Sequence, residues 1–549
     1  MTLSAKVARN VTYSSVRLFL LAPLPFLLIP YFLKKLGPSG YGTWAVLLAI
    51  SSLTSLADVG LVATLSKHVA EFYALKDFPA LNRLINTGFA LYLSIAIVGA
   101  ASLWLSAPWL LSTLFRGSAL PLGQLQALWR SLILFMVANI LALLLFSVVV
   151  GLQRMDVSAC LGSANVLASA ALSVVFLHWN WGIRGILYAY VIAAWITFFA
   201  YIYALGRLLP EIRFDLTTCR WSVAKEILGF SLKIYVSQMA VVIHNQIEKL
   251  YLAHFVGVVQ AGWYDISSDL ALRLRSIPGL MLPPMLPAAS ELEALGDHRR
   301  LQHFYQRAHK YLAFAAMPMV VFVLFAAKSF VKLWVRPGLS VIAAPLCVLL
   351  VVNILNLATG PGFLTLLGKG ILKPGLYSAV AGIVLNCSLS LVLIWAFGFQ
   401  GAVIGTSISM AAASVFFLYL FQRQTHGAFP SVMRNYWKAL GCSLAIVPVL
   451  WLVTRSEPNS WGLLVFRGLF FGVAYLLLLL AVRFFDAVDL SIAGAFFPVP
   501  GVIQRLIARR EGPFTVLRLY LLEKQRFGKL AYSLVGLVDG IRGKTNRFG

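Results

Sequence analysis

The side chains best suited to chemistry in this sequence are polar and charged residues inside otherwise apolar segments. The segment VVIHNQIEKLYLAHF holds His244, Asn245, Gln246, Glu248 and Lys249 within about a turn and a half of helix. His244 and Glu248 share one helix face, as do Asn245 and Lys249. Because lipid does not solvate such a face, we expect it to line a cavity. A helix end among lipid headgroups is the alternative.

The next segment, WYDISSDLALRLRSIPG, carries a line of charge along one helix face. Asp265, Asp269 and Arg273 follow one another at intervals of four residues, and Arg275 lies just beyond them. A guanidinium group can bind phosphate in a fork, so Arg273 and Arg275 are the best candidates for binding an anion. An Asp269–Arg273 pair that only neutralises itself is the other interpretation.

Three further charges lie near or within apolar segments. Arg130 and Arg17 are weaker candidates for a cavity, and Arg130 is also suited to capping its own helix. Asp58 lies near the end of the apolar stretch LGPSGYGTWAVLLAISSLTSLADVGL. Asp58 has two interpretations. It is a carboxylate at a helix end that reaches the membrane interface or bonds neighbouring amides, or it is a polar residue at the cytoplasmic mouth of a cavity, where it would bind a proton or another ion.

The composition indicates which scaffold positions these residues. The chain has 549 residues, of which 60% are hydrophobic and 12% charged, and its mean hydropathy is +0.85. Soluble domains average about a quarter charged residues. Apolar runs long enough to span a bilayer, about 20 residues each, predict an all-α integral membrane protein. We place fourteen transmembrane helices near residues 15–33, 41–64, 87–114, 128–151, 157–178, 184–205, 227–250, 261–287, 308–330, 339–367, 374–397, 400–421, 436–454 and 462–485.

The distribution of basic residues predicts the orientation. About thirty of the 45 Lys and Arg residues fall in the tail and in the loops on the side of the N-terminus, which the positive-inside rule assigns to the cytoplasm. Both termini are therefore predicted to be cytoplasmic. The net charge of +26 reflects this asymmetry, and binding to nucleic acid, which needs a soluble basic face, is not expected.

An internal repeat organises the chain. YFLKKLGPSGYGTW, from Tyr31, aligns with YLAHFVGVVQAGWY, from Tyr251, so that Gly37 pairs with Gly257 and Gly42 with Gly262. The same register, without a gap, pairs AEFYALKD with SELEALGD. VANIL and VVNIL, and then WGIRG and FGFQG, follow at slightly smaller offsets. Each copy holds six predicted spans, which favours two pseudo-symmetric six-helix bundles with a cavity between them.

The repeat predicts the domain boundaries. We assign residues 1–222 to an N-terminal bundle, 223–425 to a C-terminal bundle, 426–486 to two extra helices, and 487–549 to a tail. The tail mixes basic and apolar residues at helical spacing, which favours an amphipathic helix on the cytoplasmic leaflet. Docking to a glycosyltransferase or polymerase, and simple disorder, are the alternatives for the tail.

The sequence contains none of the catalytic motifs that we looked for. GFLTLLGKG has five residues between its first two glycines where a Walker A loop has four, and Gly370 stands where that loop has Ser or Thr. HExxH and GxSxG are absent, and the five cysteines are scattered without a CxxC pair. We therefore predict no enzyme activity, no cofactor and no metal site, and expect the energy for any transport to come from an ion gradient, the membrane potential or substrate flux.

Several motifs together resemble a known family. LGPSGYGTW, then SLADVGL and HVAEF, resemble the opening of Wzx-like O-antigen flippases, whose superfamily also holds multidrug-and-toxin extrusion transporters and the lipid II flippase. In the second half, IEKLYLAHFVGVVQAGWY and NCSLSLVLIWAFGFQGAVIGTSIS look like further family segments. The resemblance implies two bundles in a V around a central cavity, working by alternating access. It also implies an undecaprenyl-diphosphate-linked oligosaccharide as substrate, moved across the bacterial inner membrane.

Two sets of candidate site residues follow. The residues that we expect to bind substrate are Arg273, Arg275, Lys249, Asn245, Gln246 and Arg130. The residues that we expect to couple transport to a proton or another ion are Asp58, Glu248, Asp265, Asp269 and His244. The acidic residues keep an ion-coupled multidrug or small-molecule exporter as an alternative, and a membrane-bound envelope enzyme or scaffold is a third hypothesis.

Overall fold

The structure is a computed structural model of the full chain. It describes residues 21–53, 60–115, 118–212, 215, 219–335, 337–425, 429–453, 460–486 and 489. Among these residues there is no β-strand, so the predicted all-α fold class is confirmed. Asp58, Arg17 and almost all of the predicted tail lie outside the described residues.

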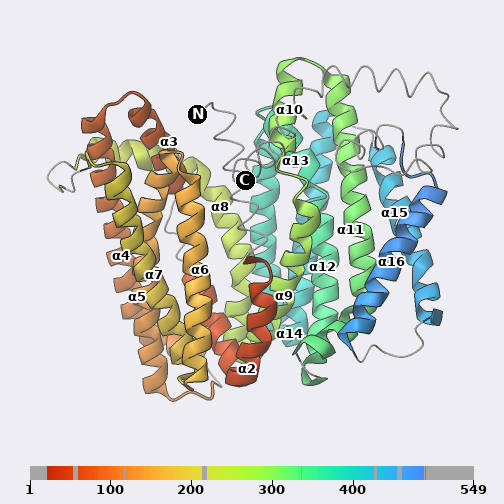
Figure 1. The fold of residues 1–549 in the computed structure, drawn as a ribbon, viewed down its shortest axis with the longest axis horizontal. Helices are drawn as coiled ribbons and strands as arrows, with labels where there is room; N and C mark the ends of the chain where they lie inside the picture. The colour runs from red at the N-terminus through yellow and green to blue at the C-terminus, as the bar shows by residue number, and fades with distance from the viewer. Residues whose placement is uncertain are drawn as a thin grey trace, which may run out of the picture.

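The described helices run roughly parallel to one another (Figure 1). Their order is α2 Leu24–Leu53, α3 Leu61–Ala74, α4 Phe78–Leu114, α5 Leu122–Gly151, α6 Met155–His178, α7 Gly182–Leu208, α8 Trp221–Phe255, α9 Val258–Gly279, α10 Met285–Ala294, α11 His298–Val335, a 3-10 helix Pro337–Ile342, α12 Ala343–Leu357, α13 Gly360–Gly368, α14 Lys373–Thr425, α15 Phe429–Val453 and α16 Trp461–Ala481.

Each predicted span overlaps one of these helices. Eight helices in the described part of the chain are long and apolar enough to cross a bilayer unaided. α8 and α9, which carry most of the candidate site residues, are not among these eight. The total of fourteen spans stays a prediction.

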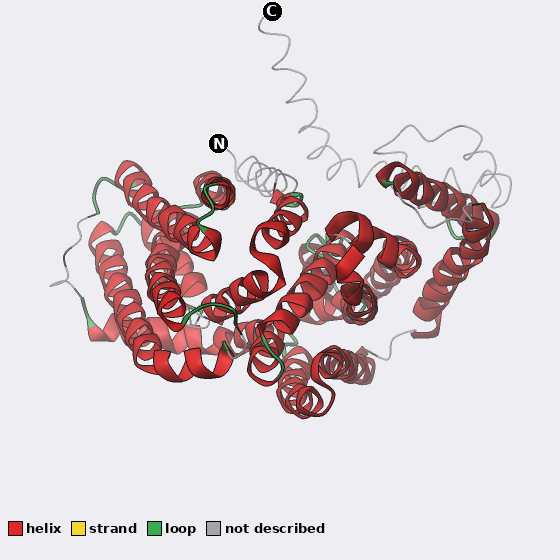
Figure 2. Cartoon of the chain, turned by 90° about the horizontal axis from the view of Figure 1, so that it is seen from below, coloured by secondary structure: helices red, strands yellow, loops and turns green. Residues whose placement is uncertain are grey.

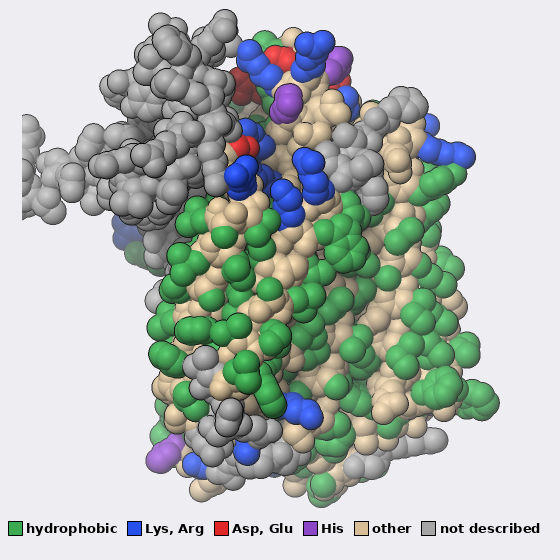
Figure 3. All heavy atoms as spheres, turned by 90° about the vertical axis from the view of Figure 1, so that its right-hand side faces the viewer, with side chains coloured by type: hydrophobic (Ala, Val, Ile, Leu, Met, Phe, Trp, Pro, Cys, Tyr) green, Lys and Arg blue, Asp and Glu red, His purple; other side chains and the backbone are tan. Residues whose placement is uncertain are grey.

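The surface has the banding of a membrane protein. Figure 3 shows a broad band of hydrophobic side chains on the face of the molecule that it presents, with Lys, Arg and His at both ends of the band and most of them at one end. Exposed His298, Arg299 and Arg300, at the start of α11, belong to that end. α11 has 38 residues and is about 57 Å long, well beyond the roughly 30 Å of a hydrocarbon core. The molecule therefore projects out of the bilayer at the end that carries α10, which we call the α10 end.

The helices form two groups. In Figures 1 and 2, α3 to α7 make up one group and α9 to α14 the other, with α2 and α8 between them and α15 and α16 on the outer flank. One apolar core lies among α3, α4, α5 and α7, around Tyr92, Met136 and Leu144. Another core joins both groups, because it contains residues of α2 and α5 as well as α9, α11 and α12.

The glycines paired by the sequence repeat make equivalent turns. Gly37 and Gly257 have φ angles of 70° and 134°, and each separates two helices that run in opposite directions. Gly182 and Gly398, paired by WGIRG and FGFQG, have φ angles of 58° and 56°. Such angles are accessible to glycine and strained for most other residues. The two copies therefore share backbone geometry at these glycines as well as sequence.

Side chains paired by the repeat also make the same hydrogen bonds. Asp77 Oδ1 accepts from the backbone N–H of Ala80 at 2.9 Å, and Asp297 Oδ1 accepts from that of Arg300 at 3.1 Å. Asn139 and Asn353 each donate their amide to the backbone oxygen four residues earlier, at 2.8 Å in both cases. These matches support two pseudo-symmetric halves, while the exact boundaries of the domains stay a prediction.

The two halves meet where α2 crosses α9. A Cβ added to Gly262 would lie 2.8 Å from the Cα of Gly42, and one added to Gly42 would lie 2.5 Å from the carbonyl carbon of Val258. The repeat pairs these two glycines in sequence, and the fold brings them into contact in space. The crossing lies within the first two turns of α9, close to Gly257, so the halves are closed together at the end opposite α10.

A cluster of charge ties the end of α16 to α11. Lys310 bonds to both Asp486 and Asp489, and Arg307 Nη1 lies 3.3 Å from Asp489 Oδ1 and 3.5 Å from Asp486 Oδ1. Tyr311 donates its hydroxyl to Asp489 Oδ1 at 2.7 Å. We call these residues the junction cluster. The cluster fixes the point at which the chain leaves α16.

Candidate functional site

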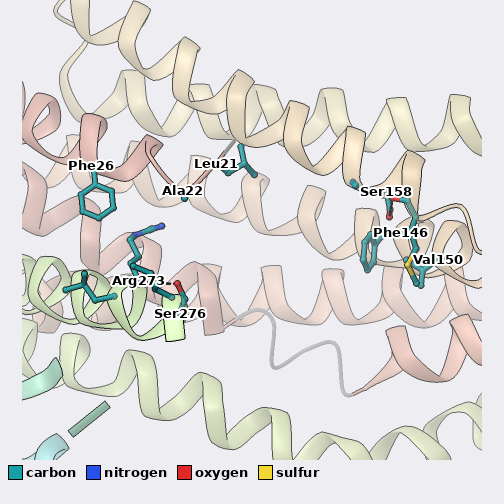
Figure 4. Close-up of a pocket in the computed structure, with 12 residues that line it drawn as sticks. Leu21, Ala22, Phe26, Phe146, Val150, Ser158, Arg273 and Ser276 are labelled. Atoms are coloured by element: carbon teal, nitrogen blue, oxygen red, sulfur yellow. Dashed lines mark hydrogen bonds between the residues drawn. The ribbon is translucent and has the colours of Figure 1, made fainter. Parts of the chain in front are cut away.

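One cavity lies between the two halves of the molecule. Its volume is about 600 Å³, and its wall combines the start of α2, the end of α5, the start of α6 and the end of α9. Figure 4 shows Phe146, Val150 and Ser158 on one side of it, and Phe26 and Arg273 on the other. Because α9 ends where α10 begins, this central cavity lies toward the α10 end.

Among the described residues that line the central cavity, Arg273 is the charged one. Its Nε and Nη2 donate to the two carboxylate oxygens of Asp269 at 2.6 and 3.1 Å. Both side chains remain about one-third exposed, at 35% and 34%. The pair predicted from the spacing of four residues is therefore formed, and Arg273 also reaches the cavity.

A second, smaller cavity lies inside the C-terminal half. Its volume is about 170 Å³, and α8, α9, α12 and α14 contribute to its wall. Five of the candidate residues line it together with Ser268, namely His244, Asn245, Gln246, Lys249 and Asp269. The prediction that the polar face of α8 lines a cavity agrees with this geometry. We call this space the inner cavity.

Asp269 connects the inner cavity with the central cavity through its contact with Arg273. Its side chain lines the inner cavity, while its partner Arg273 lines the central cavity. The pair therefore stands between the two cavities. A change in the charge of Asp269 would alter what Arg273 can bind on the other side.

Asp265 links the two halves of the protein. Lys249 Nζ lies 2.6 Å from Asp265 Oδ1, and the hydroxyl of Tyr41 in α2 donates to Asp265 Oδ2 at 3.0 Å. Because Tyr41 neighbours Gly42, this network lies at the α2–α9 crossing. Lys249 is paired with a carboxylate, as Arg273 is, and it lines the inner cavity and not the central one.

Glu248 is fully buried among neutral polar groups. Its Oε1 accepts from the amide of Asn386 at 2.6 Å and from the hydroxyl of Thr406 at 2.8 Å. Thr406 also shares a hydrogen bond of 2.8 Å with Tyr264. Oε2 of Glu248 and Oδ1 of Asn386 are buried and have no hydrogen-bond partner among the described residues. This carboxyl oxygen is therefore left with unused capacity for a hydrogen bond in a buried position, where an unpartnered polar atom is costly.

The structure does not bring Arg275 into the central cavity. Residues two apart on a helix point about 200° apart, and Arg275 contacts Asn353 and Asn356 of α12 instead of the first half of the chain. The expected grip of both arginines on one headgroup therefore does not match the geometry, in which Arg273 and Arg275 line separate cavities.

The remaining candidates lie elsewhere. Arg130 is exposed and stacks over the ring of Trp104 at 5.8 Å, away from the cavities that contain the other candidates. Asp58, like Arg17, lies outside the described residues. The clustering thus concerns α8 and α9, and the first half of the chain contributes mostly apolar wall.

Reasoning from the sequence missed the partners of these residues. Tyr41, Asn353, Asn356, Asn386 and Thr406 are the polar residues that hold the candidate charges. A usable signal existed for two of them, because Asn386 is the amide of the segment NCSLSL and Asn353 is the amide of the repeated VVNIL. Tyr41 and Thr406 are inconspicuous in apolar helices and become meaningful once the packing is known.

The fold defines a class of protein, an all-helical polytopic membrane protein. The structure is similar to that of the lipid II flippase MurJ in an inward closed conformation, at 15% identity and a TM-score of 0.65, over 85% of this chain and 98% of that one. It is also similar to an inward-facing multidrug resistance MATE family transporter of the MOP superfamily, at 15% identity and a TM-score of 0.58, over 76% and 98% of the two chains. A third similar structure is that of a MOP superfamily transporter from Pyrococcus furiosus, at 14% identity and a TM-score of 0.52, over 77% of this chain and 94% of that one. At such identities the likeness concerns the fold.

The particular family follows from the sequence. Residues 35–335 match the family described as polysaccharide biosynthesis protein, and the chain belongs to this family. No curated protein matches the chain significantly. The family resemblance identified from its motifs is thus confirmed.

Proposed function

We propose that this protein carries an undecaprenyl-diphosphate-linked oligosaccharide across the bacterial inner membrane by alternating access, for the synthesis of a surface polysaccharide. In this proposal the α10 end and both termini face the cytoplasm, and the protein is not an enzyme. The family match and the fold support transport of a lipid-linked substrate. The carried glycan is outside what the proposal specifies.

The observation that carries the proposal is the position of Arg273. A guanidinium group on an otherwise largely apolar wall offers one charged anchor for a diphosphate, and the apolar remainder suits a polyprenyl chain. The cavity of about 600 Å³ accommodates a headgroup and part of a glycan. Ser158 and Ser276, also on the wall, offer hydroxyl groups to a sugar.

Asp269 supplies a physical basis for coupling. Its carboxylate occupies the face of Arg273 that a diphosphate would use. When Asp269 takes up a proton from the inner cavity, its hold on Arg273 weakens and the guanidinium becomes free to bind substrate. Thr406 lines the same inner cavity and bonds Glu248, so a second carboxyl group is connected to this route.

The experiment is polysaccharide export in a strain that lacks the chromosomal gene. Arg273→Ala and Arg273→Gln should abolish export at unchanged protein level, because the anchor for the diphosphate is lost. Arg273→Lys keeps the charge without the fork and should retain part of the activity. Arg130→Gln is the matched control, since it neutralises an exposed arginine outside the cavities that hold the other candidates.

Normal export by Arg273→Ala would refute the role of this residue. A direct version of the test uses proteoliposomes with a fluorescent lipid-linked oligosaccharide, whose accessibility from outside reports transfer between the leaflets. Transfer that is equal in wild-type and protein-free vesicles would refute the flippase function itself.

An ion-coupled exporter of a cationic small molecule is the second candidate. Asp265, Asp269 and Glu248 place three carboxylates in or beside the inner cavity, and the fold is shared with a multidrug resistance transporter. Loss of the gene would then increase drug susceptibility and leave the surface polysaccharide intact. Partners at the tail, such as a glycosyltransferase or polymerase, belong to the first proposal and would be found by crosslinking from residues 487–549.

A further inference from the structure

A third cavity lies at the α10 end of the C-terminal half. Its volume is about 420 Å³, and it is enclosed by the end of α9, the end of α12 and the start of α13. Arg275, Asn356 and Thr359 are its polar wall residues, and the remainder of the wall is apolar. Within the described part of the first half no residue lines it, and it shares no wall residue with the central cavity, so we treat this α9–α13 cavity as a separate space.

Arg275 is held in place there by neutral groups. Nη1 donates to Asn353 Oδ1 at 3.3 Å, and Nη2 donates to Asn356 Oδ1 at 2.8 Å. Within the described parts of the chain, Arg275 has no carboxylate partner, whereas Arg273 has Asp269. The two amides orient the guanidinium without neutralising it, so the cavity keeps a full positive charge. A guanidinium group has five N–H donors, which leaves three beyond these two bonds.

We propose that the α9–α13 cavity binds a phosphate group, held by Arg275, at a site distinct from the transport cavity. The guanidinium fork matches the oxygens of a phosphate, and the volume far exceeds that of a halide. Phe363 on the cavity wall is 43% exposed, and Leu280 and Met281 beside it are 49% and 42% exposed. Such surroundings suit the phosphate of a membrane lipid headgroup, and free phosphate shares the same chemistry.

The test uses the purified full-length protein in detergent, in an Arg273→Gln background so that the central cavity does not contribute. Into this background we introduce Arg275→Gln and, as the matched neutralisation outside both sites, Arg130→Gln. One arm measures the shift of the unfolding midpoint on adding inorganic phosphate against chloride at equal ionic strength, because a ligand that binds the folded state raises this midpoint. The other arm measures retention of phosphatidylglycerol against diacylglycerol by native mass spectrometry.

We expect phosphate or phosphatidylglycerol to bind in the background variant and with Arg130→Gln. The affinity should fall at least about tenfold with Arg275→Gln, since one charge-assisted hydrogen bond accounts for that much. Binding of both probes identifies the phosphate group itself as the ligand, and binding of phosphatidylglycerol alone identifies the lipid headgroup. Failure of both probes to bind overturns the proposal, as does binding that is unchanged by Arg275→Gln.

A second variant covers the case in which Arg275→Gln does not fold. Gly279 lines the same cavity, and a Cβ there would meet only Leu357 Cδ1, at 3.6 Å. Gly279→Phe should fill the space while Arg275 and both amides stay in place, and it should abolish binding of the probe. Retained binding in Gly279→Phe would place the ligand elsewhere. None of these readouts depends on glycan export, so they stand apart from the proposed function.

Discussion

The contact between Gly42 and Gly262 makes alternating access testable with a single methyl group. In Gly42→Ala the new Cβ would overlap the carbonyl oxygen of Val258 and lie 2.5 Å from its carbonyl carbon, whereas carbon atoms pack at about 3.5 Å or more. α2 and α9 must therefore separate by at least about 1 Å, or the backbone must distort. Gly262→Ala is milder, because its closest contact is 2.8 Å, to the Cα of Gly42.

The cost falls on the conformation in which this end is closed. Overpacking of this kind costs about 1–3 kcal/mol, which changes the ratio of two conformations by about 5- to 160-fold. If the halves open at this crossing during transport, the open form does not contain the clash. Gly42→Ala should then shift the population toward a form that is open at the α2–α9 crossing and closed at the α10 end.

The assay is a distance measurement across the α10 end. Leu75 and Leu295 are paired by the sequence repeat, lie on opposite halves and are 70% and 68% exposed. Spin labels on cysteines at these two positions, with the five native cysteines replaced, report the opening by pulsed electron resonance. We expect Gly42→Ala to increase the short-distance population and Gly262→Ala to do so less.

The matched control is Gly206→Ala in α7, where an added Cβ meets nothing within 4 Å. If Gly42→Ala gives the same distance distribution as this control and both export normally, then the crossing is not a moving contact. The explanation by alternating access at this point would be refuted. Tyr41→Phe, which removes the hydrogen bond to Asp265 without adding an atom, should shift the distances in the same direction.

Three further predictions concern other parts of the molecule. Burial raises the pKa of Asp486, but Lys310 and Arg307 outweigh it and lower that pKa below its usual 3.8. The contribution of Asp486 to stability is therefore present above pH 3.8 and is lost as the pH falls through the lowered pKa. In a thermal unfolding series, Asp486→Asn should be less stable than the wild type at pH 7 and should lose less stability on acidification. Glu248→Gln should preserve folding, because Asn386 and Thr406 can still donate to its carbonyl oxygen, and should abolish the dependence of transport on an imposed ion gradient in proteoliposomes. Asp77→Ala and Asp297→Ala should each cost about 1 kcal/mol of unfolding free energy, because each removes an N-cap. Asp297 also pairs with Arg300 at 3.0 Å, so the comparison is made in an Arg300→Ala background, where unequal effects would contradict the equivalence of the two caps.

The features that the sequence predicted well are those that local geometry determines. A glycine between two apolar helices indicates a turn, and the pairing of Gly37 with Gly257 therefore survived in the φ angles. Asp77 and Asp297 were paired as letters, and each caps the helix that follows it. The spacing of Asp269 and Arg273 was also sufficient, because residues four apart on a helix meet whatever else packs around them.

The features that the sequence did not reveal depend on packing between distant helices. The partners of Glu248 lie 138 and 158 residues away, on α14, and nothing in the local pattern around Glu248 selects them. Arg130 was a weaker candidate, and it is exposed with its guanidinium group over the ring of Trp104. A periodic pattern gives the faces of a helix relative to one another, and it does not say which neighbour each face meets.

The separation of Arg273 from Arg275 shows what this limit means for function. A spacing of two residues already places the side chains on opposite sides of α9, so one diphosphate bound by both was improbable on geometry alone. The sequence did not show which groups surround Arg273 and which surround Arg275. One side holds Asp269 and the wall formed with the first half, and the other holds two amides of α12. An arginine beside a carboxylate can be released by a proton, and one between two amides keeps its charge. This difference in surroundings is the basis on which we propose a switchable transport site at Arg273 and a permanent anion site at Arg275.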